Sequence, residues 1–426
     1  MTAAKPPRPL QPAPPPPSSG PPSHATIRGA DPAGIGVYVH FPWCLKKCPY
    51  CDFLSVASPA PDLPHGRYAD AVLAELERRV RELGARRLRS VFFGGGTPSL
   101  WAPAEVGRVL SAIFQAFDAG GSSPEVTLEC NPTSFDLPRA EAFGAVGVNR
   151  FSIGVQGLEA ARLQFLGRLH DPAGALRAVQ EAVASSVERV SADLIFGVAA
   201  EPPETAAAEA ATVADLGLTH VSAYALTIEP GTQFGALAKK GKLPLLDEGR
   251  VAESFQAVDE ALGARGFEHY EISNYARAGA YAEHNLGYWR GTEYLGLGCG
   301  AWGTVDFAGQ RVRYRNTPVP ERYLASTEHW STVPLLEAGP GELVSVVEHL
   351  DRETLLRERI LLGLRLAEGL DIDAQAAELG VEAWPKDRQR AAQRLLDRGR
   401  IVQHGTRWLI PKDQWLFADG TISTLL

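Results

Sequence analysis

The 426-residue sequence lacks any apolar run of about 18 residues, the length that a membrane-spanning helix needs. It also lacks the compact apolar stretch of a secretory signal, so we expect a cytoplasmic protein with no integral membrane segment. Acidic residues outnumber basic ones, with 50 Asp and Glu against 42 Lys and Arg, which gives a formal net charge of −8. Because a negative charge is unfavourable for binding a phosphate backbone, we expect no nucleic acid partner.

Cysteine is scarce, with five residues in the chain, and three of these five lie within eight positions. The three are Cys44, Cys48 and Cys51, in the stretch VYVHFPWCLKKCPYCDF at 37–53, whereas Cys130 and Cys299 stand alone. In a reducing compartment, a tight group of cysteines is more often a metal or redox site than a disulfide framework.

Three kinds of site compete for the spacing C-x3-C-x2-C. A structural zinc site usually takes two well separated pairs of ligands, and no second pair exists here. A thiol redox motif needs two cysteines, which CPYC at 48–51 supplies, but it leaves Cys44 without a role. A 4Fe–4S cluster held by three thiolates uses all of them and leaves one iron open for another ligand. The spacing therefore favours the cluster, and a zinc-stabilised binding module remains an alternative.

The length predicts two or more folded units, because a single core stops growing at about 250–300 residues. Residues 1–35 contain eleven of the 32 prolines and almost no large apolar side chains, which predicts a disordered tail. We expect a core barrel at 36–303, a connecting segment at 304–344 and a small C-terminal domain at 345–426. In that last domain a helix leads into two short strands, a pattern typical of a winged-helix-like unit.

Short β-branched runs alternate with helical stretches from residue 36 onwards. The runs are 36–41, 90–95, 126–132, 150–156, 189–197 and 220–230, and residues 68–83 have the apolar spacing of an amphipathic helix. Six strand–helix units in series predict a parallel sheet with right-handed crossovers. The predicted fold class is α/β, with a partial (β/α)6 barrel of the TIM-like kind favoured over a doubly wound sheet.

Residues suited to ligand binding follow the predicted strands. The cysteine loop follows the first strand, GGGTPS at 94–99 follows the second, and Glu129, Gln156 and Asp193 lie at the next three. Because ligands of parallel barrels bind at the carboxyl ends of the strands, we expect these segments to meet at one mouth. Glycines allow a ligand to approach the backbone closely, and carboxylates accept hydrogen bonds from ammonium or hydroxyl groups. A glycine-rich turn after a strand is, by itself, as often purely structural as it is part of a binding site.

The cysteine spacing, with Tyr50 just before the last cysteine, resembles the radical S-adenosylmethionine (SAM) superfamily. In that superfamily SAM binds the open iron of the cluster, and one electron cleaves it to a 5′-deoxyadenosyl radical. The resemblance implies that Cys44, Cys48 and Cys51 hold the cluster. It also implies SAM contacts from Tyr38, Tyr50, Gly95, Gly96, Thr97, Glu129, Gln156, Arg168 and Asp193.

A longer set of motifs resembles the haem chaperones of the HemW family, relatives of the oxygen-independent coproporphyrinogen III oxidase HemN. These motifs are YVHFPWCLKKCPYCDF, FFGGGTPSLW, NRFSIGVQ, LGRLH, HVSAYALTIEPGT, YEISNYA and HNLGYWRG. The resemblance implies a protein that binds haem and passes it to acceptor haemoproteins, with a HemN-type C-terminal domain. It also implies an electron donor such as flavodoxin or ferredoxin and a monomer or homodimer, and it assigns no catalytic residue.

The alternative within this group is the oxidase activity, which converts coproporphyrinogen III to protoporphyrinogen IX by two decarboxylations. The oxidase has a further cysteine two residues after the third, whereas here Asp52 and Phe53 follow Cys51. This difference favours the chaperone.

The segment HNLGYW at 284–289 is the one that the HemW family associates with haem. The resemblance therefore implies His284, Tyr288 and Trp289 as haem contacts. Without it, a lone histidine beside aromatic residues is more often a hydrogen-bonded core residue. The chain also departs from many relatives at Trp302, where they have a histidine.

Overall fold

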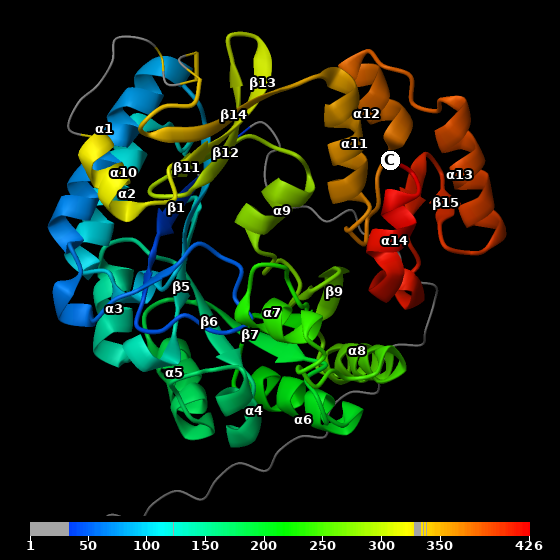
Figure 1. The fold of residues 1–426 in the computed structure, drawn as a ribbon, viewed down its shortest axis with the longest axis horizontal. Helices are drawn as coiled ribbons and strands as arrows, with labels where there is room; N and C mark the ends of the chain where they lie inside the picture. The colour runs from blue at the N-terminus through cyan, green and yellow to red at the C-terminus, as the bar shows by residue number, and fades with distance from the viewer. Residues whose placement is uncertain (1–33, 122, 328–333, 335, 338) are drawn as a thin grey trace, which may run out of the picture.

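The computed structural model describes residues 34–121, 123–327, 334, 336–337 and 339–426. The predicted tail at 1–35 lies almost entirely outside these described residues. The central feature of the described chain is one strongly curved sheet, which opens toward the C-terminal helices (Figure 1).

Six strands pair in parallel in the order in which they occur in the chain. They are β1 (Ile35–Phe41), β4 (Leu88–Gly95), β5 (Glu125–Cys130), β6 (Arg150–Gln156), β7 (Arg189–Phe196) and β8 (His220–Ala225). The six are buried along most of their length, as expected when helices cover a parallel sheet. This arrangement confirms the partial (β/α)6 barrel. Because these six strands lie in the sheet in the same order as in the chain, the doubly wound alternative was wrong.

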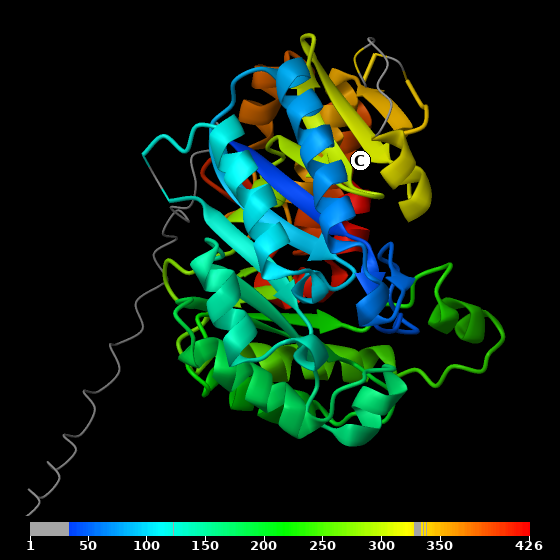
Figure 2. The same ribbon diagram turned by 90° about the vertical axis from the view of Figure 1, so that its left-hand side faces the viewer.

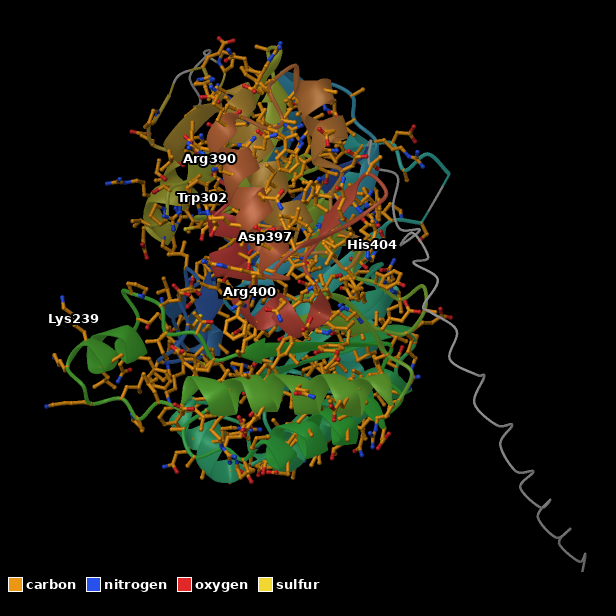
Figure 3. The ribbon with its side chains drawn as sticks, turned by 90° about the vertical axis from the view of Figure 1, so that its right-hand side faces the viewer. Lys239, Trp302, Arg390, Asp397, Arg400 and His404 are labelled. Carbon is orange, nitrogen blue, oxygen red and sulfur yellow. The ribbon has the colours of Figure 1, made fainter. Side chains whose placement is uncertain are left out.

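Helices cover the outer face of the sheet (Figure 2). They are α1 (His65–Leu83), α2 (Pro103–Ala116), α3 (Leu137–Ala145), α4 (Ala160–Phe165), α5 (Pro172–Ala184), α6 (Pro203–Ala214) and α8 (Glu248–Gly263). The predicted helix at 68–83 is α1, and its residues Tyr68, Val72 and Leu76 lie in the main core at helical spacing. Helix α7 (Gln233–Lys239) instead projects from the body, as Figures 2 and 3 show.

The sheet continues at both edges beyond the predicted strands. Strand β11 (Tyr294–Leu297) pairs in parallel with β1 and is followed by antiparallel β12 (Trp302–Phe307), β13 (Gln310–Asn316) and β14 (Val344–Leu350). At the other edge, β10 (Asn274–Ala276) and β9 (Glu268–Glu271) follow β8. A separate small sheet pairs β2 (Trp43–Cys44) with β3 (Val56–Ala57).

The sequence predicted that residues 304–344 only connect two domains. In the structure these residues are also part of the main fold. They include β13 and α10 (Pro320–Ser326), and Val312 and Tyr323 lie in the main core. The buried carboxylate of Glu75 on α1 fixes this part in place, because it accepts hydrogen bonds from Asn316 Nδ2 at 2.8 Å and Tyr323 Oη at 2.8 Å. The exact domain boundaries stay a prediction.

The C-terminal part has its own core and lies at the open side of the curved sheet (Figure 1). It contains α11 (Arg352–Gly363), α12 (Ile372–Leu379), α13 (Lys386–Asp397), β15 (Val402–His404), β16 (Arg407–Leu409) and α14 (Ala418–Ser423). The predicted helix and two short strands correspond to α13, β15 and β16. Glu358 on α11 forms an ion pair with Arg313 on β13, and Leu366 forms a bridge with Glu271 on β9. This part therefore contacts β13 near one end of the sheet and β9 at the other end.

Candidate cofactor site at the barrel mouth

A cavity of about 480 Å³ lies at the carboxyl ends of the parallel strands, and we call it the cysteine cavity. All three clustered cysteines line it. The structure also places eight of the nine predicted SAM contacts on its wall, namely Tyr50, Gly95, Gly96, Thr97, Glu129, Gln156, Arg168 and Asp193. The segments that follow the parallel strands therefore meet around one cavity, as the sequence predicted.

The cysteine loop follows β1, and a backbone hydrogen bond forms within the loop. Cys44 lies in β2, and the amide of Cys51 donates a hydrogen bond to the carbonyl of Cys48 at 3.2 Å. Side chains from other loops contact the sulfur atoms. Thr97 Oγ1 lies 3.4 Å from Cys44 Sγ, and Arg168 Nη1 lies 3.6 Å from Cys48 Sγ. These contacts connect three separate segments around the thiols.

Burial keeps two of the thiols protonated in the protein chain itself. Desolvation raises the pKa of Cys44 above its ordinary value, and it raises the pKa of Cys51 to about 11. Thiolates are the form that binds iron, so a positively charged metal group must displace these protons when it binds.

The glycine-rich loop after β4 approaches the cysteine loop at backbone distance. Gly95 has a φ of +111°, a conformation that side chains rarely allow. At Gly96, an added Cβ would lie only 2.5 Å from the carbonyl oxygen of Trp43. Glycine is therefore required there for the two loops to meet.

Two carboxyl groups also line the cysteine cavity. Glu129 Oε2 accepts a hydrogen bond from the Gly95 amide at 3.0 Å, and Asp193 Oδ1 accepts one from Ser152 Oγ at 3.0 Å. Burial and the nearby Asp193 raise the pKa of Glu129 to about 8, and burial also raises the pKa of Asp193. Acceptors of this kind suit the ammonium and ribose hydroxyl groups of an aminoacyl nucleoside.

The fourth strand ends in an unusual backbone conformation. Gln156 has a φ of +65°, and the register between β6 and β7 shifts between Ile153 and Gln156. Non-glycine residues held in this region are often found at functional sites. Beside it, Arg168 Nη2 donates to the carbonyl of Gly154 at 2.9 Å, which orients the guanidinium in the cavity wall.

Tyr38, the ninth predicted SAM contact, lies elsewhere. It lines a second cavity of about 460 Å³ deeper in the barrel, where its hydroxyl forms a hydrogen bond with His40 Nδ1 at 2.9 Å. The two cavities share Asp52, Phe53, Gly95, Glu129, Ser152, Asp193 and Tyr224. Sequence reasoning missed several residues of this second cavity, namely His40, Phe92, Arg150, Tyr294 and Arg315.

The three predicted haem contacts do not share one surface. His284 is 1% exposed and forms hydrogen bonds through both ring nitrogens, to Ser90 Oγ at 2.9 Å and to Tyr288 Oη at 2.9 Å. It lines the second cavity on α9 (Glu283–Trp289). Trp289 lines a third cavity of about 470 Å³, which lies between α9, β13 and α11, and Tyr288 lines both.

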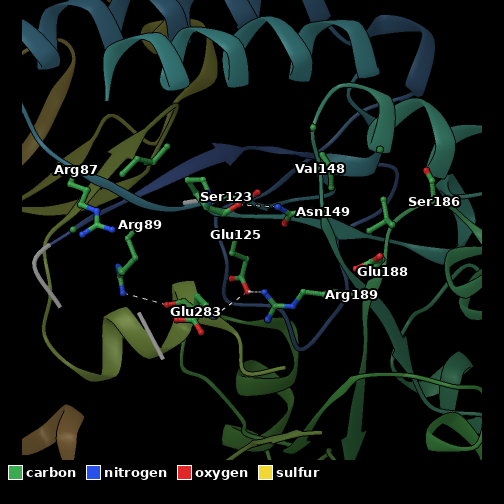
Figure 4. A pocket seen from close by; sticks show the side chains of 16 residues that line it. Arg87, Arg89, Ser123, Glu125, Val148, Asn149, Ser186, Glu188, Arg189 and Glu283 are labelled. Atoms are coloured by element: carbon green, nitrogen blue, oxygen red, sulfur yellow. Dashed lines mark hydrogen bonds and ion pairs between the residues drawn. The ribbon is translucent and has the colours of Figure 1, made fainter. Parts of the chain in front are cut away.

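A larger cavity of about 790 Å³ lies at the opposite end of the barrel, by the amino ends of the strands (Figure 4). Charged residues line it, and some of them pair with one another, as Arg189 does with Glu125 at 2.9 Å. None of the cysteines or predicted cofactor contacts lines it. Size therefore does not identify the cofactor site here.

The donor set of the cysteine cavity fits a three-thiolate 4Fe–4S cluster with SAM. Within the described residues, no group of three or more His, Cys, Asp or Glu side chains is arranged to hold a single metal ion. Each thiolate of a cluster binds a different iron, so the sulfur atoms need not converge on one point. The glycine loop, the two carboxyl groups and Arg168 supply partners for the remaining groups of the nucleoside.

Comparisons with known proteins agree with this geometry. The family model described as "Radical SAM superfamily" matches residues 38–211, and that described as "HemN C-terminal domain" matches residues 350–417. A curated protein of Mycobacterium tuberculosis named "Heme chaperone HemW" is 34% identical over 397 residues, which cover 92% of this chain and 95% of the relative. The chain belongs to the HemW family of radical SAM proteins.

Two further curated relatives agree with this assignment. The mouse protein named "Radical S-adenosyl methionine domain-containing protein 1, mitochondrial" is 38% identical over 350 residues, with 82% of this chain and 76% of the relative covered. Escherichia coli "Heme chaperone HemW" is 36% identical over 279 residues, with 65% and 72% covered. The family resemblance inferred from the sequence motifs is confirmed.

A solved structure confirms the fold of this HemW-family chain. The radical SAM enzyme coproporphyrinogen III oxidase (HemN) of Escherichia coli superposes with a TM-score of 0.73 and 19% identity, and the match covers 93% of this chain and 91% of that chain. Within the described residues, no helix has the length and apolar character that crossing a membrane requires.

Proposed function

We propose that this protein binds haem and passes it to acceptor haemoproteins, while a 4Fe–4S cluster and SAM occupy the cysteine cavity. The observation that carries the proposal is the 34% identity to a named haem chaperone across 92% of the chain. The cysteine cavity supports the cofactor part, because it brings the three thiols together with eight residues of the expected SAM set.

Different residues of the cysteine cavity would bind different parts of the cofactors. Cys44, Cys48 and Cys51 would hold the cluster, which together with bound SAM supplies one-electron radical chemistry. Arg168 would pair with the carboxylate of SAM, as a guanidinium does best. Glu129 and Asp193 would accept hydrogen bonds from its ammonium and ribose groups, and Tyr50, Gly95, Gly96, Thr97 and Gln156 would line the remaining surface.

For haem we propose the third cavity, with Tyr288 and Trp289 against the porphyrin plane. This cavity has mainly apolar walls. Arg311, Arg313 and Arg359 also line it, and each forms an ion pair within the chain, with Asp306, Glu358 and Glu378 respectively. We propose that His284 acts by positioning α9, because both of its ring nitrogens already have partners inside the barrel. Tyr38 would then border the cofactor from the second cavity.

The oxidase activity of HemN is the second candidate, and the likeness in fold favours it only in part. The identity to HemN is 19%, and Asp52 and Phe53 occupy the positions where the oxidase motif continues with cysteine. We further propose a cytoplasmic location, a flavodoxin or ferredoxin donor and a monomer or homodimer. The curated mouse relative is named as mitochondrial, so cell fractionation and light scattering are the checks for location and oligomeric state.

Anaerobic reconstitution followed by haem titration tests the proposed function. We expect a shifted Soret band on haem addition and movement of that haem to an apo-haemoprotein supplied as acceptor. Trp289→Ala should weaken haem binding. Trp384→Ala, which changes a residue packed against the core of the C-terminal part, should not. A Soret band that stays that of free haem in the cluster-loaded protein would defeat the proposal, and formation of protoporphyrinogen IX would favour the oxidase.

A further inference from the structure

Lysine is rare in this chain, and most of the lysines lie in two short segments. The sequence contains eight lysines, and five of them are Lys46 and Lys47 in the cysteine loop and Lys239, Lys240 and Lys242 in or just after α7. All five are exposed, and we call them the lysine face. Within the described residues none of the five forms an ion pair with a carboxylate, and Lys47 donates to the carbonyl of Phe53 at 3.2 Å.

A small core holds the two segments together. The amide of Phe234 in α7 donates a hydrogen bond to the carbonyl of Pro49 in the cysteine loop at 2.9 Å. The ring centre of Phe234 lies 4.8 Å from that of Phe165, and Tyr50 packs against the same core. Figure 2 shows α7 beside the cysteine loop, and Figure 3 shows Lys239 at the outer end of this projection. The lysines of α7 therefore belong to the surface around the cysteines.

The segments that make up this surface carry charge of one sign. Residues 42–51, 163–170 and 231–246 contain the five lysines and Arg168 but no Asp or Glu. Exposed acids occur at the flanking positions Asp52 and Asp247. Like charges gathered in this way create a local potential that attracts an oppositely charged surface. The lysine face is thus a positive region on a chain whose net charge is −8.

Large apolar side chains are exposed on the same segments. Phe53, Leu245 and Leu169 are 62%, 59% and 53% exposed, which are the three highest values among the large apolar residues that the structure describes. Phe53 lies two residues after the last cysteine, and Leu169 lines a small pocket together with Lys46 and Cys48. Exposed apolar groups surrounded by charged ones are typical of a surface that binds another protein.

The lysine face lies beside the thiols that would hold the cluster. Lys46 lines the cysteine cavity. Burial raises the pKa of Cys51, and the charge of Lys47 opposes this rise, so these two groups lie near each other. An electron passes efficiently only over a short distance, so a protein that reduces the cluster must dock close to the cysteine loop. Electron-transfer complexes are small and are steered by complementary charge.

We propose that the lysine face docks an acidic electron-donor protein against the cysteine loop. One electron leaves the donor and enters the cluster, so the donor is oxidised and the cluster is reduced by one electron. This inference rests on the proposed cofactor site, and it specifies where the donor binds and which charge its surface carries.

Carbodiimide cross-linking tests the contact in the full-length chain without any cofactor, because it joins a lysine amine to a carboxylate in direct contact. The probe is a flavodoxin of net negative charge. We expect cross-links that peptide analysis assigns to the lysine face. Cross-links confined to lysines outside this face would overturn the proposal.

Stopped-flow spectroscopy of the reconstituted protein measures the electron transfer itself. The combined variant Lys239→Glu, Lys240→Glu and Lys242→Glu should be reduced by reduced flavodoxin at least about tenfold more slowly at low ionic strength, because the steering charge is reversed. The difference should largely disappear in about 1 M salt, where charges are screened beyond about 3 Å. Dithionite needs no docking surface, so its reduction of the cluster and the melting temperature of the variant should be unchanged.

The matched control is the combined variant Lys386→Glu, Arg394→Glu and Arg398→Glu, which changes the charge equally at exposed positions on and just after α13. Its rate with flavodoxin should equal that of the unaltered chain. An unchanged rate in the Lys239→Glu, Lys240→Glu and Lys242→Glu variant, or equal slowing in the control, would overturn the proposal.

A membrane is the other acidic partner to separate from a protein. Loss of binding to phosphatidylserine vesicles in the variant of the lysine face, with an unchanged rate of reduction by flavodoxin, would assign this face to a membrane and overturn the proposal. If dithionite fails to reduce the unaltered chain, the proposed cluster is wrong, and the cross-links still decide where the donor binds. The two failures are therefore seen separately.

Discussion

Replacing Gly96 with alanine is the perturbation that tests the cofactor site most sharply. Gly96 lies where the glycine loop meets the cysteine loop, and an added Cβ would lie 2.5 Å from the carbonyl oxygen of Trp43 and 2.9 Å from its amide nitrogen. Both neighbouring atoms belong to backbone, so neither can rotate away. The two loops must separate for the methyl group to fit.

The size of the effect follows from this overlap. Ordinary contact begins near 3.4 Å, so the loops must move apart by about 0.9 Å at this point. Overpacking of this kind costs about 1–3 kcal/mol. If the bound nucleoside spans both loops, the same energy weakens SAM binding by about 5- to 150-fold.

Calorimetric titration of SAM into the reconstituted protein measures this change. Gly66→Ala is the control, because its Cβ would lie 3.8 Å from a flexible glutamate oxygen near the start of α1, and alanine is favoured in helices. We expect Gly66→Ala to bind SAM normally. A Gly96→Ala protein that keeps its cluster and binds SAM within twofold of the unaltered chain would refute the reasoning.

Three further predictions concern the cluster, the carboxyl wall and the core. Cys48→Ser should remove most iron and sulfide from the anaerobically reconstituted protein, whereas Cys130→Ser should not, and elemental analysis decides this. The pKa of Glu129 rises to about 8 from 4.5, so the folded chain keeps a proton that the unfolded chain releases, and stability falls as pH rises through this window. Glu129→Gln should flatten this fall in thermal unfolding of the cofactor-free chain from pH 5 to 8, and an unchanged profile would contradict the assignment. Glu75→Gln leaves the buried Arg79 without the negatively charged partner that lies 3.3 Å away, which should cost about 3 kcal/mol or more in urea unfolding, and a loss below 1 kcal/mol would count against the network.

The parallel core could be predicted because its physical signal is local. Short β-branched runs separated by amphipathic helices specify a parallel sheet, and parallel strands place their carboxyl ends together. This rule locates Glu129, Gln156 and Asp193 at one mouth without any knowledge of contacts. It does not give depth along a strand, and the structure places Tyr38 in the second cavity instead of on the wall of the cysteine cavity. Tyr38 pairs in register with Phe92, three residues before Gly95, and therefore lies below the mouth.

The outer strands were missed although they carry a readable pattern. In β13, Arg311, Arg313 and Arg315 alternate with Val312 and Tyr314, and the structure buries the second set. This is the period of two that a half-buried antiparallel strand requires. The pairing of Arg189 with Glu125 could not be read from the sequence, because it depends on which carboxylate lies beside the arginine in the folded barrel. The haem segment shows the same limit, since Tyr288 and Trp289 are adjacent in sequence but only Tyr288 lines the second cavity.

Electron paramagnetic resonance of the reduced, anaerobically reconstituted protein, recorded with and without SAM, tests the central claim most directly. The account predicts a 4Fe–4S signal that changes on addition of SAM, because the nucleoside binds the iron that Cys44, Cys48 and Cys51 leave open. A cluster signal that is identical in the two samples would contradict it.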